Sequence, residues 1–339
     1  DKDIGSMKTG ILRAILSCLV SCAALAAQTP AARPQVLGIS HLGFYTSNLA
    51  ATEAFWENLL GFQSPYVLRK SDGQVRIAFI KINNRQHIEL FNQKPPTGVA
   101  FFSHIAFITD NARQMYAYLK SRGVEVPPHW GSGQSGGKGK TGDLNFEVRD
   151  PDGHLVEFVQ YAPDDWRSKR LNQDIPPTRI ADSIMHAGFT VGNVEKSEAF
   201  YEGILGFTNF WQGSANHGRS LSWVDLRVPN GSDYIELMLY GGSEPPARRL
   251  GTMDHVCLLV PHIHRVVAEI EARPAYKTYG KPIVAKTGVN HKWQANLFDP
   301  DGTRIELMEP DTYDGKPVPS SNAPPPRASR QGKKAARPG

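Results

Sequence analysis

The chain has 339 residues, of which 40% are hydrophobic and 21% are charged, and it contains only three cysteines. Such a composition is typical of a globular protein with about two domains, and so few cysteines exclude a disulfide scaffold and a Cys-x-x-Cys zinc site. The formal charge of +5 does not predict a nucleic-acid-binding protein, because six basic and no acidic residues fall in 316–339 and leave the rest near neutral.

The N-terminal residues predict export. Residues 1–6 look like a cloning remnant ahead of a natural start at Met7, and 7–27 combine a basic start, a short apolar run and small residues, as signal peptides do. Cleavage before Ala27 fits this pattern, and a lipoprotein box ending at Cys22, which would leave a lipid anchor, is the alternative. The run is too short to span a membrane. We therefore expect a periplasmic or secreted protein, either soluble or a lipoprotein.

An internal repeat organises the body of the chain. The same landmarks occur twice in the same order, 145 to 151 residues apart, and such spacing indicates two homologous modules. The modules span 37–162 and 183–310, with a proline-containing linker at 163–182 between them. The tail at 311–339 is basic and rich in proline, which predicts disorder.

Each module is predicted to contain two βαβββ units, because alternating apolar segments surround one amphipathic segment in each half. The Asp-Pro-Asp-Gly sequence near the end of each module predicts a hairpin turn, in which proline presets one φ and glycine takes a positive φ. In module 1 we expect, in chain order, a strand at 39–46, a helix capped by Asn48 and ended by Gly61, strands near 75–82, 87–91 and 104–108, a helix at 112–121, and strands near 145–149 and 155–160.

Four polar residues interrupt otherwise apolar strands in each module. Glu157, for example, shares its strand face with Leu155 and Val159, where a carboxylate is costly unless it is paired or bound to a metal. Two imidazoles with one or two carboxylates suit a divalent ion such as Fe(II), Mn, Ni or Zn. The residues are His41, Glu89, His104 and Glu157 in module 1, and His186, Glu236, His255 and Glu306 in module 2.

These motifs resemble the vicinal oxygen chelate superfamily, which includes glyoxalase I, extradiol dioxygenases and fosfomycin-resistance proteins. The resemblance covers both modules and implies an α+β fold, in which two βαβββ units per module form a curved mixed sheet around a metal cup. It also implies a metal that acts as a Lewis acid on two adjacent oxygens of a small-molecule substrate. The motifs are the His41 and His186 strands with their Leu-Gly-Phe helix ends, the His104 and His255 strands, and Asp-Pro-Asp-Gly followed by Glu157 or Glu306.

Two tandem modules look like type I extradiol dioxygenases, whose second module usually holds the iron. This resemblance implies Fe(II) at His186, His255 and Glu306, with His291 as the catalytic acid-base. Asn296 stands where that group has its signature tyrosine, and the spacing after His291 is shorter than in its pattern. Four aromatic residues of module 2 are candidates for an aromatic-substrate pocket: Trp211, Trp223, Trp293 and Phe298.

Two other interpretations stay open. A glyoxalase-like lyase or isomerase with Ni, Zn or Mn would use Glu89 and Glu236 as fourth ligands, although Tyr45 and Thr190 stand where that branch has its glutathione-binding arginine. A non-catalytic protein would only bind a small molecule in the cup. Spacing alone does not decide whether each site is built within one module or by exchange of half-units, between modules or between the chains of a homodimer.

Overall fold

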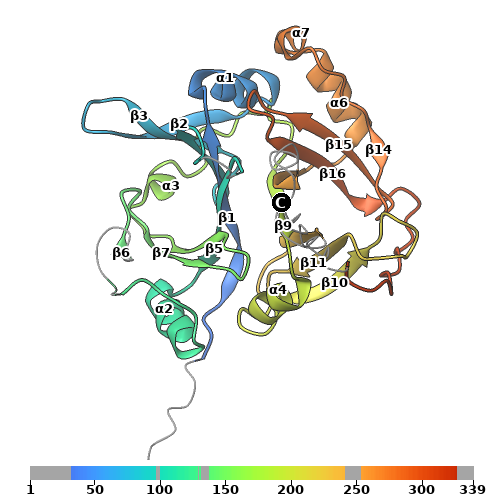
Figure 1. The fold of residues 1–339 in the computed structure, drawn as a ribbon. Helices are drawn as coiled ribbons and strands as arrows, with labels where there is room; N and C mark the ends of the chain where they lie inside the picture. The colour runs from blue at the N-terminus through green and yellow to red at the C-terminus, as the bar shows by residue number, and fades with distance from the viewer. Residues whose placement is uncertain (1–31, 97–99, 129, 131–136, 241–252, 327–339) are drawn as a thin grey trace, which may run out of the picture. The chain divides into compact units, whose positions relative to one another are not determined.

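A computed structural model describes residues 32–96, 100–128, 130, 137–240 and 253–326 (Figure 1). The expected cloning remnant, signal peptide and Cys22 anchor lie outside these residues. Two eight-stranded mixed sheets, one per repeat, form the body of the protein and confirm the predicted α+β tandem fold. No helix among the described residues is long and apolar enough to cross a membrane.

The first sheet carries module 1. Its four central strands are β4, β1, β5 and β8, in which β1 pairs in parallel with β4 and antiparallel with β5, while β5 and β8 are parallel. In spatial order the strands are β2 (Gln63–Arg69), β3 (Val75–Lys81), β4 (His87–Asn92), β1 (Val36–Thr46), β5 (Phe102–Thr109), β8 (Leu155–Gln160), β7 (Leu144–Arg149) and β6 (Gly137–Lys138).

The second sheet repeats this topology in module 2, with β12, β9, β13 and β16 in the centre and the same strand directions. Its strands in spatial order are β10 (Thr208–Gly213), β11 (Trp223–Arg227), β12 (Tyr234–Leu239), β9 (Ser183–Val191), β13 (His255–Leu259), β16 (Arg304–Thr312), β15 (Lys292–Phe298) and β14 (Lys286–Thr287).

The two helices predicted with bounds in module 1 are present and begin where the sequence predicts. The side chain of Asn48 accepts a hydrogen bond from the Ala51 amide (3.2 Å) and caps the first helix, which changes to a π-helix before Gly61 takes a φ of +80°. Asn193 caps the matching helix of module 2 through the Lys196 amide (3.0 Å). The helices are α1 (Leu49–Ala54), the π-helix η1 (Phe55–Leu59), α2 (Ala112–Ser121), α3 (Trp166–Lys169), α4 (Val194–Tyr201), α6 (Ile263–Glu271) and α7 (Pro274–Tyr279).

One apolar core continues from module 1 into module 2, and the rings of Phe102 and Phe189 stack 6.0 Å apart across the junction. The two Asp-Pro-Asp-Gly turns make reciprocal contacts there. Asp301 of module 2 accepts hydrogen bonds from the Thr46 hydroxyl (2.7 Å) and the Ser47 amide (3.0 Å), just before α1. Asp152 of module 1 accepts one from the Gly192 amide (2.9 Å), just before α4. The turns therefore bind the modules to each other as well as reversing the chain.

The linker and the start of the tail are more structured than their composition predicts. Within the linker, α3 buries Trp166 and Arg167 against module 1. In the region expected to be a disordered tail, β16 continues to Thr312, and the chain follows a defined path to residue 326. The Ser321 amide donates to the Gln212 carbonyl (2.8 Å) on the edge strand β10, because this edge offers unpaired main-chain groups.

Candidate metal centres

Each central strand of module 1 contributes one member of the predicted quartet. His41 lies on β1, Glu89 on β4, His104 on β5 and Glu157 on β8, so all four donors come from a single module. Strand alternation and the pairing register point the side chains to one face of the sheet, where all four are buried. The exchange of half-units that the sequence left open is therefore not needed to assemble the quartet.

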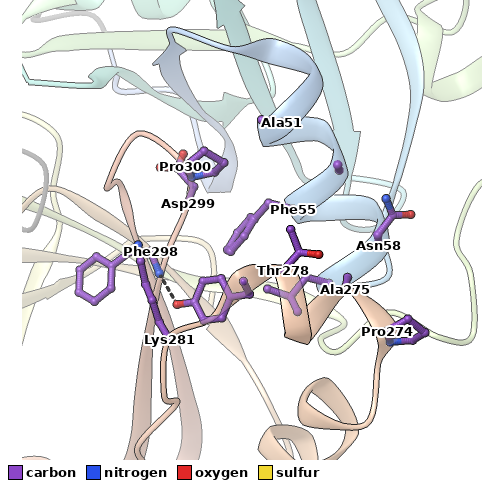
Figure 2. Close-up of a pocket in the computed structure, with 13 residues that line it drawn as sticks. Ala51, Phe55, Asn58, Pro274, Ala275, Thr278, Lys281, Phe298, Asp299 and Pro300 are labelled. Carbon is purple, nitrogen blue, oxygen red and sulfur yellow. Dashed lines mark hydrogen bonds between the residues drawn. The ribbon is translucent and has the colours of Figure 1, made fainter.

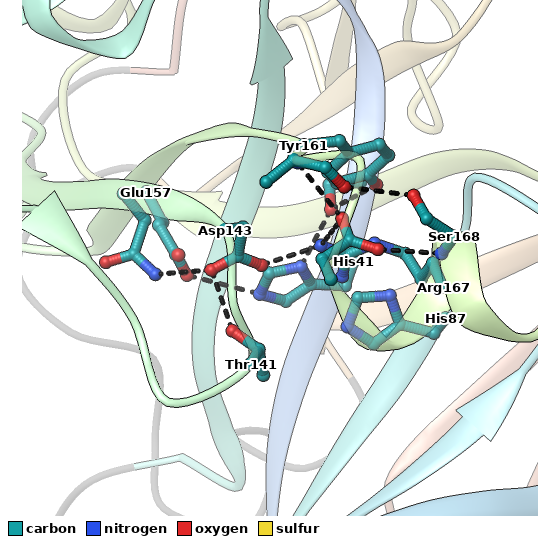
Figure 3. A network of polar contacts seen from close by, with 12 residues as sticks. His41, His87, Thr141, Asp143, Glu157, Tyr161, Arg167 and Ser168 are labelled. Carbon is teal, nitrogen blue, oxygen red and sulfur yellow. Dashed lines mark hydrogen bonds and ion pairs between the residues drawn. The ribbon is translucent and has the colours of Figure 1, made fainter.

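The donor atoms of module 1 converge (Figure 3). His41 Nε2 lies 3.0 Å from His104 Nε2 and 3.2 Å from Glu157 Oε2, and Glu157 Oε2 lies 3.4 Å from His104 Nε2. Donors about 2.1 Å from one ion are separated by roughly 3.0 to 3.4 Å at right-angle or tetrahedral bond angles. Glu89 Oε1 is slightly farther, 3.7 Å from His41 Nε2. The quartet thus fits a single divalent ion.

Module 2 repeats this geometry. His186 Nε2 lies 3.1 Å from His255 Nε2 and 3.3 Å from Glu306 Oε2, and His255 Nε2 lies 3.2 Å from Glu306 Oε2. Glu236 Oε2 is 3.7 Å from His255 Nε2, and the matching distance in module 1, from Glu89 Oε2 to His104 Nε2, is 3.9 Å. This second quartet also fits one ion.

A glycine makes room for the second histidine in each module. Gly43 lies beside both Glu89 and His104 in the register, and a Cβ there would lie 2.4 Å from the Cε1 atom of His104. Gly188 occupies the same place beside His255. A side chain at either glycine would push the imidazole away from the other donors.

Hydrogen bonds set the tautomer of His41. The Tyr161 hydroxyl donates to the Arg85 carbonyl, which can only accept, so Ser40 Oγ donates to the Tyr161 oxygen (2.7 Å) and accepts from His41 Nδ1 (2.9 Å). The proton therefore lies on Nδ1, and the lone pair of His41 Nε2 faces the other donors, as metal coordination requires.

The histidines of module 2 have different partners. His255 Nδ1 lies 2.9 Å from the Met253 carbonyl, to which it can donate when Nε2 binds an ion, and 2.5 Å from Nη2 of Arg304. His186 Nδ1 is buried without a hydrogen-bond partner in the described part of the chain, because Met185 stands where module 1 has Ser40.

The two centres differ in charge. Burial lowers the pKa of His104, but the hydrogen bond and charge of Glu157 outweigh it and raise that pKa to about 9. Burial, together with the positive charge of Arg304, lowers the pKa of His255 to about 4. The Arg304 guanidinium lies 3.0 Å from His255 Nε2, whereas Leu155 occupies its position in module 1. Without an ion, module 1 holds a proton on its second histidine, whereas module 2 has the fixed charge of Arg304.

The pKa values of the two carboxyl groups in the module 2 quartet are shifted in opposite directions. Although burial opposes ionisation, hydrogen bonds from His186 and His255 lower the pKa of Glu306 well below its usual range. Burial raises the pKa of Glu236 to about 7. Glu306 is therefore a fixed anion, and Glu236 can exchange a proton near neutral pH.

Besides Arg304, sequence reasoning missed His87 and Cys257, which lie beside these clusters. His87 is fully buried, its ring lies 4.4 Å from that of His41, and burial lowers its pKa well below the usual value. Cys257 pairs in register with Glu306 and is buried, which raises the pKa of its thiol well above the usual value. Strand alternation could have found both, because His87 is two residues from Glu89 and Cys257 is two residues from His255.

The structure places the other candidate residues of module 2 at several different positions. His291 lies exposed in the turn before β15, with a φ of +57° and its ring 5.4 Å from Tyr313. Trp293 packs against His264 of α6. Phe298 lines a cavity of about 810 Å³ between η1 and α7 (Figure 2). Trp211 on β10 pairs in register with Asp225, and Asp225 pairs with Glu236, so Trp211 and Trp223 lie on the face of the sheet that carries the quartet, on its two outer strands β10 and β11.

Comparisons with known proteins agree with the fold. The model of the glyoxalase/bleomycin resistance protein/dioxygenase superfamily matches residues 38–158 and 183–307. The chain belongs to this superfamily, as the resemblance implied.

Several relatives and solved structures are similar to the chain. The lactoylglutathione lyase of Schizosaccharomyces pombe is 27% identical over 234 residues, which cover 64% of this chain and 68% of the relative. The virulence protein STM3117 of Salmonella typhimurium is 27% identical over 126 residues, 37% of this chain and 84% of that protein. The fold resembles a homoprotocatechuate 2,3-dioxygenase variant from Brevibacterium fuscum (TM-score 0.60, 18% identity, 86% of this chain and 76% of that one). It also resembles the 2,3-dioxygenase LapB of Pseudomonas sp. KL28 (0.57, 17%, 85% and 98%).

Proposed function

We propose that the protein is a metal-dependent enzyme that acts on a small substrate with two adjacent oxygen atoms, with module 2 as the catalytic module and Fe(II) as its ion. The observation that carries this proposal is the convergence of His186, His255 and Glu306 at separations of 3.1 to 3.3 Å. Two imidazoles and one carboxylate on one side of an ion leave positions open for other ligands. An ion there would supply Lewis acidity toward the substrate oxygens and, as Fe(II), electrons for dioxygen.

The chain's own residues supply the remaining chemistry. Arg304 places a positive charge beside His255 and would stabilise an anionic oxygen of the substrate. Glu236 lies within the donor cluster, where its carboxyl group is placed to take up or give a proton beside the ion. We favour Glu236 over the exposed His291 for this proton step because Glu236 belongs to the donor cluster.

Glu236 also supports a second candidate function, a lyase or isomerase that moves a proton without oxygen. The similarity to the lactoylglutathione lyase of S. pombe favours the same alternative. In that case Ni, Zn or Mn would serve as well as iron, since only Lewis acidity is needed. The requirement for dioxygen separates the two candidates.

The test combines metal analysis with oxygen uptake. Protein reconstituted anaerobically with Fe(II) is expected to retain metal and to consume oxygen with a member of a catechol panel. His41→Ala should retain this activity, and His186→Ala should lose it. Conversion of a glyoxalase substrate without oxygen, with no catechol-dependent uptake, would favour the lyase or isomerase. If neither quartet retains a metal, both enzyme proposals fail and a small-molecule-binding protein is left.

Export is a separate proposal that depends on the N-terminal sequence. N-terminal sequencing of protein from a bacterial host would show cleavage before Ala27, or at Cys22 for a lipoprotein. An intact N-terminus on cytoplasmic protein would contradict it.

A further inference from the structure

We propose that module 1 holds its ion in a closed centre with five protein donors, of which His87 is the fifth, and that this centre is structural while module 2 is catalytic. The inference depends on the proposed function in that both centres need a divalent ion. Closed coordination is typical of structural metal sites, whereas catalytic sites keep an open position.

The place of His87 in the sheet directs its ring toward the quartet. It begins β4, pairs in register with His41 and is two residues from Glu89, so His87 and Glu89 lie on the same face of the strand. His87 is 0% exposed, and neither ring nitrogen has a hydrogen-bond partner among the described residues. A buried polar group without a partner is costly, and coordination of a metal ion by one ring nitrogen would offset this cost.

The distances place His87 within one group of donors. Its Nε2 lies 3.5 Å from Glu89 Oε1, which in turn lies 3.7 Å from His41 Nε2. Donor atoms of His41, His87 and Glu89 lie within 4.8 Å of one another, as do those of His41, His104 and Glu157. His41 belongs to both sets, so an ion bound by its Nε2 would have His87 and Glu89 on one side and His104 and Glu157 on the other, and we assign all five donors to that ion.

The linker closes this centre from outside. Trp166 of α3 lies 5.3 Å from the ring of His87 and stacks on Tyr66 of β2, an edge strand of the sheet, at 5.2 Å. The adjacent Arg167 binds Asp143, which precedes β7 near the opposite edge (2.6 Å; Figure 3). The helix α3 therefore joins the two sides of the sheet next to His87.

Module 2 offers a matched comparison. Tyr234 begins β12, pairs in register with His186, and its ring lies 4.6 Å from the His186 ring. Its hydroxyl contacts Met185 Sδ (3.6 Å) instead of a donor atom of the quartet. Module 2 therefore has an aromatic ring where module 1 has His87. The Cys257 thiol of module 2 lies within 4.8 Å of donor atoms of His186 and Glu306, and X-ray absorption would distinguish a sulfur ligand there from an imidazole.

The first test uses cobalt(II) as the probe and full-length protein. His186→Ala isolates the module 1 centre, and His41→Ala isolates that of module 2. X-ray absorption is expected to count three imidazoles around Co(II) in His186→Ala and two in His41→Ala. Two imidazoles in His186→Ala would overturn the inference. If either variant fails to fold, wild-type protein loaded with two ions should give an average between two and three, and an average of two would overturn the inference.

The second test removes the fifth donor. In the His186→Ala background, His87→Phe is expected to weaken Co(II) binding more than about tenfold and to change its visible absorption. Tyr234→Phe in the His41→Ala background is the control and should change neither. Unchanged affinity and absorption in the His87→Phe protein would overturn the inference. Metal binding by His41→Ala but not by His186→Ala would overturn it while sparing the proposed function, and binding by neither would contradict both.

Discussion

The imidazole of His255 lies so close to Gly188 that a Cβ at this glycine would be 1.9 Å from the Cε1 atom of the ring. Gly188→Ala is therefore expected to displace His255 and to remove the ion from module 2 alone, with at least about a hundredfold loss of activity. Metal content and oxygen uptake measure this effect. Gly43→Ala is the control and should remove only the module 1 ion, and retention of both ions in Gly188→Ala would contradict the prediction.

The hydrogen bonds from His41 to Ser40 and Tyr161 predict that a residue outside the metal ligands affects metal affinity. Ser40→Ala should weaken metal binding in module 1 by about 10- to 100-fold, because the tautomer and orientation of His41 are no longer fixed. Competition with a chromophoric chelator, in the His186→Ala background, measures the affinity. Met185→Leu, at the matching position in the His41→Ala background, should leave module 2 unchanged. Equal affinity with and without Ser40 would refute a role for this chain of hydrogen bonds.

The linker helix should stabilise the folded state through Arg167. Its guanidinium is buried, contacts Asp143 (2.6 Å) and Asp165 (3.1 Å), and lies 3.9 Å from the ring centre of Tyr161. Arg167→Gln is expected to lower the free energy of unfolding by about 3–5 kcal/mol, because two carboxylates stay buried without their cation. The control Arg170→Gln breaks an ion pair with Asp174 that solvent screens, and should cost less than about 1 kcal/mol. Urea unfolding would measure both, and similar losses would contradict the prediction.

The junction between the modules predicts a dependence of stability on pH. Burial lowers the pKa of His154, but the hydrogen bond and charge of Asp150 (2.9 Å) outweigh it and raise that pKa above its usual value. The folded protein therefore binds this proton more tightly than the unfolded chain. Its contribution to stability is fully present below pH ~6.5 and disappears as pH rises through the raised pKa.

Urea unfolding of His154→Gln between pH 6 and 9 checks this expectation. The difference in unfolding free energy between wild type and variant should shrink as pH rises, which separates His154 from the metal-binding histidines common to both proteins. His262→Gln changes an exposed histidine and serves as the control. A constant difference across this range would show that protonation of His154 does not stabilise the junction.

Much of the fold follows from local patterns, and so does the composition of the quartets. Alternation predicted the strands of His41 and Glu157, and the sequence repeat identified the matching residues in module 2. The repeat does not identify His87, because its counterpart in module 2 is Tyr234. Repetition indicates function only at positions where the two modules have the same residue. Arg304, whose counterpart in module 1 is Leu155, escaped notice for the same reason.

Other features depend on contacts between distant segments. The proline-containing linker predicts a simple connection, but Trp166 fits between Tyr66 and Phe79, which are about a hundred residues earlier in the chain. The aromatic residues of module 2 were grouped by residue type alone. Their strand positions do not show which face meets the helices, and the packing of Trp293 on His264 is a tertiary contact.

Asp152 of module 1 binds module 2, and Asp301 of module 2 binds module 1 in the same way. Such reciprocal contacts are also found between the two subunits of a symmetric dimer. In such a dimer, one gene specifies both subunits, and every substitution occurs in both cups at once. Fusion into one chain removes this restriction, since each half is encoded separately while the two stay joined. Selection could therefore retain His87 in module 1 while it retained Tyr234 and Arg304 in module 2. Gene duplication followed by fusion thus allowed the two modules to specialise.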